Sequence, residues 1–360
     1  MNWHPLARVE RTPRTCIWEI TGACNLRCIH CENNCGPRSP QELSLDEFRR
    51  VAEGLAGLGC RHAHITGGEP LLRSDWDLCC RALTDLGIRV ALVTNGTLLD
   101  EEALDRAQAA GVSAVGISID GLREVHDSIR LRPQPGPSPW DQTLDALDRS
   151  CKRLETIVIT HVNQRNLGQL PALRDLLRQM GVRRWQIQLA IPVGRLLQIK
   201  GPYLIAPADL ESLTSFIGQA NDDGLTPAID TSDSIGYYTE KEILLRKRTT
   251  GQGLWIGCQA GIRLVAITYE GKVRGCSALP QEFDAGDLRQ ESIEDIWKDE
   301  ERFAYATRFN VAKLAGGCAG CEMGPLCRAG CTTMAYWMGG TIYDNPYCLP
   351  RVRKATSCQR

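Results

Sequence analysis

Three closely spaced cysteines near the amino terminus are the residues with the clearest chemical potential. They stand in the run CNLRCIHC as Cys24, Cys28 and Cys31, with the spacing C-x3-C-x2-C. A closed metal site usually takes four ligands, so three thiolates leave one coordination position open. Two sites fit this run: a [4Fe-4S] cluster whose fourth iron binds another ligand, or a zinc site completed by His30 or Cys35.

A second group of cysteines lies towards the carboxyl terminus. Its core is CAGCEMGPLCRAGC, with the spacing C-x2-C-x5-C-x3-C, and the whole group comprises Cys258, Cys276, Cys318, Cys321, Cys327, Cys331 and Cys348. Seven cysteines exceed one zinc site, and the spacing is unusual for a zinc ribbon, which remains the alternative. No cysteine lies between Cys151 and Cys258. The sequence therefore predicts two metal regions joined by a metal-free segment.

Composition excludes several classes of function. The chain has 360 residues, of which 43% are hydrophobic, and a formal net charge of -1. Without a basic field, strong binding of nucleic acid is not expected. No apolar run suits a signal peptide or a membrane-spanning helix. We therefore expect a soluble cytoplasmic protein, in which clustered cysteines indicate metal rather than disulfides.

Alternating apolar patterns predict an α/β fold that positions the first cysteine group. Six expected strands alternate with helices, the first of which begins with a capping box, Ser44 with Glu47. The expected strands are 16–20, 62–66, 89–94, 113–120, 155–162 and 184–190. Six such units are too few for a closed eight-stranded barrel, so we predict an open, partial (β/α)6 barrel. Its ligands should gather at the carboxyl ends of the strands.

Three regions follow from this pattern. Residues 1–200 form the predicted barrel, residues 201–257 a bridging segment, and residues 258–360 a Cys-rich domain. Within the bridge, 207–224 is an expected helix and 232–253 is expected to be irregular. The Cys-rich domain should contain a hairpin that turns at Glu270-Gly271 and a helix over 291–309.

Polar and glycine residues follow the expected strands at the same rim as the first cysteines. They occur in GGEP, TNGT and SIDG and on the sixth strand; the candidates are Gly67, Gly68, Glu69, Asn95, Ser118, Asp120 and Gln188. Two glycines allow a ligand close to the backbone. The ordinary alternatives are a glycine turn, a helix cap and a buried polar residue.

The motifs CNLRCIHC, GGEP, TNGT and SIDG resemble those of the radical S-adenosylmethionine (SAM) superfamily. The resemblance implies that SAM binds the open iron through its amino and carboxylate groups. It implies contacts of Gly67, Gly68 and Glu69 with the methionyl amine, and of Arg130 with the carboxylate. Ser118 and Asp120 would face the ribose and methionine part, Gln188 the ribose or adenine, and Asn95 lies in the same cofactor-binding set. Reductive cleavage of SAM would give a 5′-deoxyadenosyl radical that abstracts hydrogen from a substrate.

The carboxyl-terminal spacing resembles the SPASM extension of these enzymes, including Gly271 between the first two cysteines. The resemblance implies two auxiliary [4Fe-4S] clusters, three clusters in all. The outer cluster would take Cys318, Cys321, Cys327 and Cys348. The inner one would take Cys258, Cys276 and Cys331, which leaves it one cysteine short and implies an open iron or a non-cysteine ligand.

Other stretches, among them CENNCGPRSP, IGYYTEKE and DNPYCL, resemble Nif11-class peptide maturases. This implies hydrogen abstraction from a ribosomally made precursor peptide, leading to a crosslink, epimerisation or backbone excision. The alternatives are a radical SAM enzyme for a small molecule or tetrapyrrole or for maturing another enzyme, and a non-catalytic metal scaffold. Cys35, beside the cluster motif, is a candidate hydrogen-atom donor or ligand.

Partners follow from the same resemblance. Only about 15 residues precede the first expected strand, so we expect a separate leader-recognition protein or direct docking of the leader on the bridge. The run IGYYTEKEILLRKR is a candidate to line the peptide groove, with a solvated irregular segment as the alternative. A flavodoxin- or ferredoxin-type protein is the expected electron donor.

Overall fold

A single sheet of ten strands organises the chain. The computed structural model describes residues 11–199, 201, 203–232, 235–246 and 253–357, to which all structural statements refer. The strands are β1 Thr15–Glu19, β2 His62–Thr66, β3 Arg89–Thr94, β4 Ala114–Ser118, β5 Glu155–Val162, β6 Arg184–Leu189, β7 Ala228–Thr231, β8 Leu264–Ile267, β9 Lys272–Arg274 and β10 Gly286–Asp287. Their order is β10-β9-β8-β1-β2-β3-β4-β5-β6-β7.

The six predicted strands are confirmed as β1–β6, which pair parallel in sequence order. The sheet extends further at both ends. β7 pairs parallel with β6 and was not predicted. The predicted hairpin is present as β8 and β9, and β8 pairs parallel with β1. The sheet therefore has two ends, β7 and β10, as an open barrel requires.

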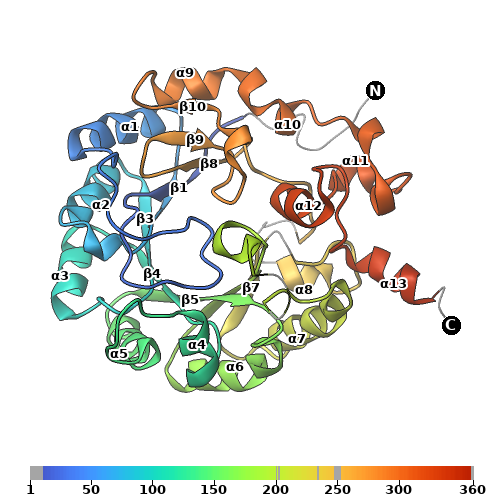
Figure 1. Ribbon diagram of the computed structural model, residues 1–360, viewed down its shortest axis with the longest axis horizontal. Helices are drawn as coiled ribbons and strands as arrows, with labels where there is room; N and C mark the ends of the chain where they lie inside the picture. Colours follow the sequence, from blue (N-terminus) through green and yellow to red (C-terminus); the bar gives the residue numbers. More distant parts are fainter. Residues whose placement is uncertain (1–10, 200, 202, 233–234, 247–252, 358–360) are drawn as a thin grey trace.

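Helices lie outside the strands (Figure 1). They are α1 Leu45–Gly57, α2 Trp76–Thr84, α3 Glu101–Ala109, α4 Arg123–Ile129, α5 Pro139–Cys151, α6 Leu170–Gln179, α7 Leu210–Asp222, α8 Glu242–Arg246, α9 Ile293–Lys298, α10 Ala304–Thr307, α11 Gly324–Cys327, α12 Thr332–Gly339 and α13 Leu349–Ser357. The capping box that begins α1 is confirmed, since Ser44 and Glu47 bond each other's backbone N–H. No helix of the described residues has the length and apolar character needed to cross a membrane.

The helix expected over 291–309 is broken. After α9 the Asp299 side chain accepts a hydrogen bond from Glu301 N (3.0 Å) and begins a separate 3-10 turn, Glu300–Phe303, which precedes α10. A carboxylate that satisfies the free N–H groups of a new helical turn favours a new start over continuation. The sequence pattern of apolar residues continues through this break, so periodicity alone missed it.

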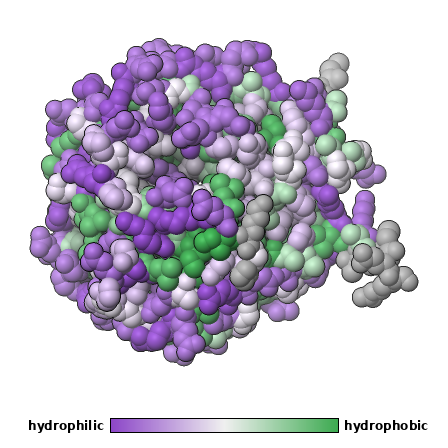
Figure 2. All heavy atoms as spheres, in the orientation of Figure 1, coloured by the Kyte–Doolittle hydropathy of each residue, from purple (hydrophilic) through white to green (hydrophobic). Residues whose placement is uncertain are grey.

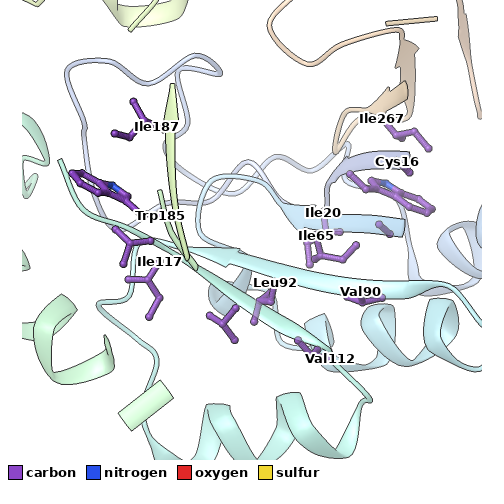
Figure 3. Close-up of a cluster of buried hydrophobic side chains, with 14 of the residues drawn as sticks. Cys16, Ile20, Ile65, Val90, Leu92, Val112, Ile117, Trp185, Ile187 and Ile267 are labelled. Atoms are coloured by element: carbon purple, nitrogen blue, oxygen red, sulfur yellow. The ribbon is translucent and has the colours of Figure 1, made fainter. Parts of the chain in front are cut away.

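The core fills the space between sheet and helices. Side chains from several strands contribute to it along the length of the sheet, as Figure 3 shows for Trp185 and Ile187 of β6, Leu92 of β3 and Ile267 of β8. All four are at most 1% exposed. Burial of a large apolar side chain contributes about 1.5–3 kcal/mol. This core holds the carboxyl ends of the strands, and so the loops that follow them, in fixed positions.

The bridge packs against the Cys-rich domain instead of lining an open groove. Tyr237 is fully buried, and its hydroxyl accepts a hydrogen bond from Cys331 N (2.9 Å). Tyr238 donates to Trp255 O (2.8 Å). Tyr237 is therefore structural, contrary to its candidacy for the peptide groove, whereas for the half-buried Tyr238 that candidacy stays a prediction. The last two residues of the predicted run, Lys247 and Arg248, lie outside the described residues.

A buried ion pair holds this bridge together and gives a testable stability effect. Arg246 Nε and Glu242 Oε1 lie 2.6 Å apart, and both side chains are at most 2% exposed. Arg246→Met leaves the carboxylate buried without its cation, which costs about 3–5 kcal/mol of unfolding free energy. Urea denaturation under anaerobic conditions measures it. The matched control is Arg178→Met, because the Arg178–Asp175 pair is exposed and is worth at most about 1 kcal/mol. Equal effects of both variants would contradict the prediction.

Candidate functional site

The loop between β1 and α1 carries the first cysteines and lies in front of the sheet (Figure 1). Cys24 N donates to Gly36 O (2.8 Å), and Gly36 N donates to Gly22 O (3.0 Å), which closes the loop on itself. Arg195, from the 3-10 helix η4 (Gly194–Leu197), donates through Nη1 to Cys28 O (3.0 Å) and also to Cys35 O. The loop is thus a fixed platform for its thiols.

The three thiols line one cavity of about 450 Å³ at the carboxyl ends of the strands. Burial raises the pKa of Cys24 to about 11 and that of Cys28 to about 12. A hydrogen bond from the Cys35 thiol is the main cause that lowers the pKa of Cys31 to about 5. Arg130 Nη1 lies 3.9 Å from Cys28 Sγ and favours its thiolate form.

This donor set fits a cluster better than a zinc ion. Among the described residues, no three His, Cys, Asp or Glu side chains converge as one ion requires. A [4Fe-4S] cluster requires no such convergence, because each cysteine binds a different iron. The two residues that could complete a zinc site already have other partners. His30 Nε2 lies 2.7 Å from Asp120 Oδ2, and the Cys35 thiol forms a hydrogen bond with Cys31.

The two glycines of GGEP leave room for the backbone of the cysteine loop to pack closely against them. Gly68 N donates to Thr21 O (2.7 Å), and a Cβ on Gly68 would lie 2.1 Å from Ala23 O. At Gly67, where φ is +153°, a Cβ would lie 2.5 Å from Thr21 O. Both glycines also line the cavity. The close approach that we predicted for a ligand is therefore made first by the backbone of the cysteine loop.

Gly68→Ala is expected to displace the cysteine loop and prevent loading of the first cluster. The added Cβ overlaps a backbone oxygen, and overpacking of this kind costs about 1–3 kcal/mol or more. Iron content after anaerobic reconstitution should fall to that of the carboxyl-terminal clusters alone. Gly57→Ala is the control, because an added Cβ there meets nothing within 4 Å. Full iron loading in Gly68→Ala would contradict the prediction.

Glu69 lies behind the cavity wall. Its buried carboxylate accepts hydrogen bonds from Thr94 Oγ1 (2.7 Å), Asn95 N (2.8 Å) and Leu71 N (3.2 Å). Burial raises the pKa of Glu69 to about 7. Glu69 does not line the cavity, whereas Thr94 and Asn95 do. Glu69 therefore holds the TNGT turn in place. This role was not predicted from the sequence, which indicated a contact with an ammonium group.

Asp120 is likewise a positioning residue behind the wall. It is fully buried, Oδ2 lies 2.7 Å from both Arg130 Nε and His30 Nε2, and Oδ1 accepts from His161 N (2.9 Å). Arg130 is the main partner that holds the pKa of Asp120 well below its usual range, against the effect of burial. Arg130 and Ser118 line the cavity as expected, but Asp120 does not.

Gln188 reaches the cavity within a polar row. Its Oε1 accepts a hydrogen bond from Gln186 Nε2 (3.1 Å), and its amide contacts His161 Nε2. Sequence reasoning missed Gln186 and the cavity histidines His30, His64 and His161. For Gln186 a signal was available: it lies two residues before Gln188 on β6 and therefore faces the same side.

The carboxyl-terminal cysteines divide into two sets. Cys258, Cys276 and Cys331 line the same cavity as the first group. Cys318, Cys321, Cys327 and Cys348 do not, and the pKa of Cys327, raised mainly by burial, is raised further by the other three thiols, which places them together. This division is the same as that of the inner and outer sets implied by the resemblance to the SPASM extension, whose role as cluster ligands stays a prediction.

Two further cavity residues, Glu19 and Glu32, were not predicted as site residues.

Comparison with known proteins agrees with this arrangement. Residues 18–177 match the radical SAM superfamily, and residues 258–322 match SPASM, an iron–sulfur cluster-binding domain. An AdoMet-dependent heme synthase of Methanosarcina barkeri (strain Fusaro / DSM 804) is 31% identical over 96% of this chain and 99% of the relative. Mycofactocin maturase MftC of Mycolicibacterium smegmatis is 27% identical over 91% of this chain and 80% of the relative.

The fold is also that of a solved relative. Streptococcus suis SuiB bound to S-adenosylmethionine superposes with a TM-score of 0.72 at 15% identity, covering 94% of this chain and 77% of that one. The radical SAM domain binds SAM and a [4Fe-4S] cluster, and the SPASM domain binds auxiliary iron–sulfur clusters. The chain belongs to the radical SAM superfamily and is an enzyme of its SPASM-containing branch.

Proposed function

We propose that this enzyme matures a ribosomally made precursor peptide in the cytoplasm. Bound SAM, cleaved by one electron, supplies a 5′-deoxyadenosyl radical that abstracts a hydrogen atom from a residue of the peptide. The product is a crosslink, an epimerised residue or an excised backbone unit. The lining of the cavity is the observation that carries this proposal.

The cavity offers many hydrogen-bonding groups and little permanent charge. Among the described residues that line it, Arg130 is the one permanent cation, and its guanidinium already pairs with Asp120. Burial lowers the pKa of His161 to about 3, so this imidazole is neutral. The carboxyl groups are Glu19 and Glu32. The neutral polar lining is Asn33, Thr66, Thr94, Asn95, Ser118, Gln186, Gln188, Ser232, Ser277 and Thr333.

Such a lining suits the N–H and C=O groups of a peptide backbone. A tetrapyrrole of the haem pathway carries several carboxylates, and the one permanent cation of the described cavity lining is already paired with Asp120, so these carboxylates would find no unpaired permanent cation there. Charge complementarity therefore favours the peptide.

An exposed apolar surface beside the cysteine loop supports peptide docking. Leu131, Leu197 and Ile199 are each more than 40% exposed. Leu131 O accepts a hydrogen bond from Arg27 N of the loop, and Leu197 belongs to η4, whose Arg195 binds the loop. Figure 2 shows hydrophobic residues gathered near the centre of the face in view, within a largely hydrophilic surface. Apolar anchors of this kind are typical of peptide recognition.

Within this proposal, the site residues have the following roles. Cys24, Cys28 and Cys31 bind the first cluster, and Gly67, Gly68, Asn95, Ser118, Arg130 and Gln188 contact SAM. Arg130 also places a positive charge beside Cys28. Glu69 and Asp120 orient these contacts from behind. A flavodoxin- or ferredoxin-type donor supplies the electron, for which the exposed Cys321 of the outer set offers a route, and a separate recognition protein holds the leader.

A tetrapyrrole substrate is the second candidate, because the heme synthase of Methanosarcina barkeri is similar over nearly the whole of both chains. The deciding experiment supplies the reconstituted enzyme, SAM and dithionite with either iron coproporphyrin III or any short precursor peptide found encoded beside its gene. We expect 5′-deoxyadenosine to exceed the substrate-free background, and a changed substrate mass, with the peptide alone. Conversion of iron coproporphyrin III and an unchanged peptide would overturn the proposal.

A further inference from the structure

A buried side chain beside the outer set of cysteines carries a hydrogen-bond donor without an acceptor. Asn345 is 1% exposed, and its Nδ2 atom has no hydrogen-bond partner among the described residues. Its Oδ1 atom accepts a hydrogen bond from Tyr347 N (2.9 Å), so the other side-chain atom is the NH2 donor. Buried polar groups of native proteins are nearly always paired, and this unpaired donor therefore indicates an acceptor other than a side chain or backbone group.

The backbone of the same residue already bonds a cysteine of the outer set. Asn345 N donates to Cys318 Sγ (3.4 Å). Asn345 also lies three residues before Cys348, in the stretch DNPYCL. The direct bond to a cysteine sulfur distinguishes Asn345 from a residue such as Tyr305, whose buried hydroxyl is unpaired as well.

The side chain of Asn345 lies against the turn that follows another cysteine of the outer set, Cys327. Gly330 N donates to Cys327 O (3.1 Å) and closes this turn. A Cβ on Gly330, whose φ is +72°, would lie 2.8 Å from Asn345 Nδ2. Glycine therefore leaves the space at the turn to the amide. The unpaired N–H groups lie between the parts of the chain that carry Cys318 and Cys327.

The sulfur atoms of an iron–sulfur cluster are the acceptors that suit this position. A [4Fe-4S] cluster held by the four outer cysteines would carry negative charge on its sulfide and thiolate sulfurs, and hydrogen bonds to these sulfurs tune its potential. The reduced cluster has one more negative charge than the oxidised one, so an N–H donor stabilises the reduced cluster more. Such a donor therefore raises the reduction potential.

We propose that the side-chain amide of Asn345 donates an N–H···S hydrogen bond to the outer cluster and thereby raises the reduction potential of that cluster. The outer cluster then accepts an electron more readily than it would without this residue. The inference rests on the binding of a cluster by the outer cysteines, as in the proposed function. It does not depend on whether the substrate is a peptide or a tetrapyrrole.

The test examines the auxiliary clusters in the full-length chain. The parent variant carries Cys24→Ala, Cys28→Ala and Cys31→Ala, which removes the first cluster, and it is produced with asparagine that carries ¹⁵N at its amide nitrogen only. Asn345→Leu, added to this parent, removes the donor with little change in volume. Pulsed electron paramagnetic resonance of the dithionite-reduced proteins detects ¹⁵N that is hydrogen-bonded to a cluster, and a redox titration gives the potential of each cluster.

Asn221→Leu in the same parent is the matched control. The amide nitrogen of Asn221 is already paired with two backbone oxygens of the bridge, Ile229 O and Leu244 O (2.9 Å each). The same substitution therefore removes hydrogen bonds of an asparagine without removing a donor to a cluster. Asn345→Asp is made as a second variant, because it keeps the acceptor for Tyr347 N while it lacks the amide nitrogen.

We expect a coupling between ¹⁵N and an auxiliary cluster in the parent and in Asn221→Leu, and its loss in both Asn345 variants. In Asn345→Leu the equilibrium constant for reduction of the outer cluster should fall about tenfold, which is about 59 mV for one electron. The potential of the inner cluster should stay that of the parent. Asn221→Leu should leave both potentials unchanged.

Iron analysis separates the failure of this inference from that of the cluster assignment. About eight irons in the parent, with no coupling to ¹⁵N, would overturn the inference alone. A coupling that persists without Asn345, or potentials in Asn345→Leu equal to those of the parent, would overturn it as well. About four irons or fewer in the parent would overturn the outer cluster, and the inference with it.

Discussion

A chain with Cys24, Cys28 and Cys31 all replaced by Ala is expected to form no 5′-deoxyadenosine from SAM. Once they are replaced, Cys35 is the one thiol of this loop left in the described cavity lining, and a single thiolate cannot hold a [4Fe-4S] cluster. Iron should fall from about twelve to about eight per chain, since each [4Fe-4S] cluster contributes four. Chromatography of the SAM cleavage products and iron analysis measure both effects.

The control for this variant removes cysteines that hold no metal. Cys79 and Cys80 of α2 are fully buried in the core, so Cys79→Ala with Cys80→Ala costs packing but leaves the cavity intact. This control should keep its iron and cleave SAM. Persistent cleavage in the triple variant would remove Cys24, Cys28 and Cys31 from the site.

Asp120→Ala is expected to have the second largest effect. The carboxylate binds Arg130, His30 and the His161 backbone, and its loss leaves the Arg130 guanidinium buried without its partner. Breaking a buried pair in this way costs about 3–5 kcal/mol. Because about 1.4 kcal/mol is a factor of ten, the affinity for SAM should fall by about two to four orders of magnitude if the whole of this cost appears in SAM binding.

Equilibrium binding of SAM to the reconstituted enzyme measures this loss. Asp141→Ala is the control, because Asp141 pairs with Arg123 on the surface, where both side chains are more than half exposed. It should bind SAM like the wild type. If Asp120→Ala bound SAM with unchanged affinity, Asp120 would have no part in positioning Arg130.

Local patterns in the sequence carried the framework of the site. Period-two apolar runs located β1–β6, the pair Ser44 and Glu47 located the start of α1, and the cysteines followed the first strand. Since parallel strands end at one rim, the polar residues that follow them were expected to meet there, and the cavity lining shows that most do. These features depend on neighbours in the sequence, which is why they could be predicted.

Features that depend on contacts between distant residues were missed. Glu69 and Asp120 lie at the expected rim, but the hydrogen bonds that their carboxylates accept from Asn95 N and Arg130 Nε were not predicted. The direction of a side chain just beyond a strand depends on the turn that follows, which alternation does not specify. β7 is four residues long and follows Pro227, too short for a periodic signal.

The pairing of β8 with β1 makes the chain indivisible. Thr15 to Trp18 are in register with Leu264 to Ile267. The strand that leads into the first cysteine loop, β1, therefore pairs on one side with β8, a strand about 250 residues later in the chain. A protein ended after residue 257 would expose the backbone groups of β1 as an unprotected edge, a template for aggregation. The SPASM region is therefore no detachable module: recombination that exchanges it between relatives must transfer the strand that completes the barrel along with the cysteines.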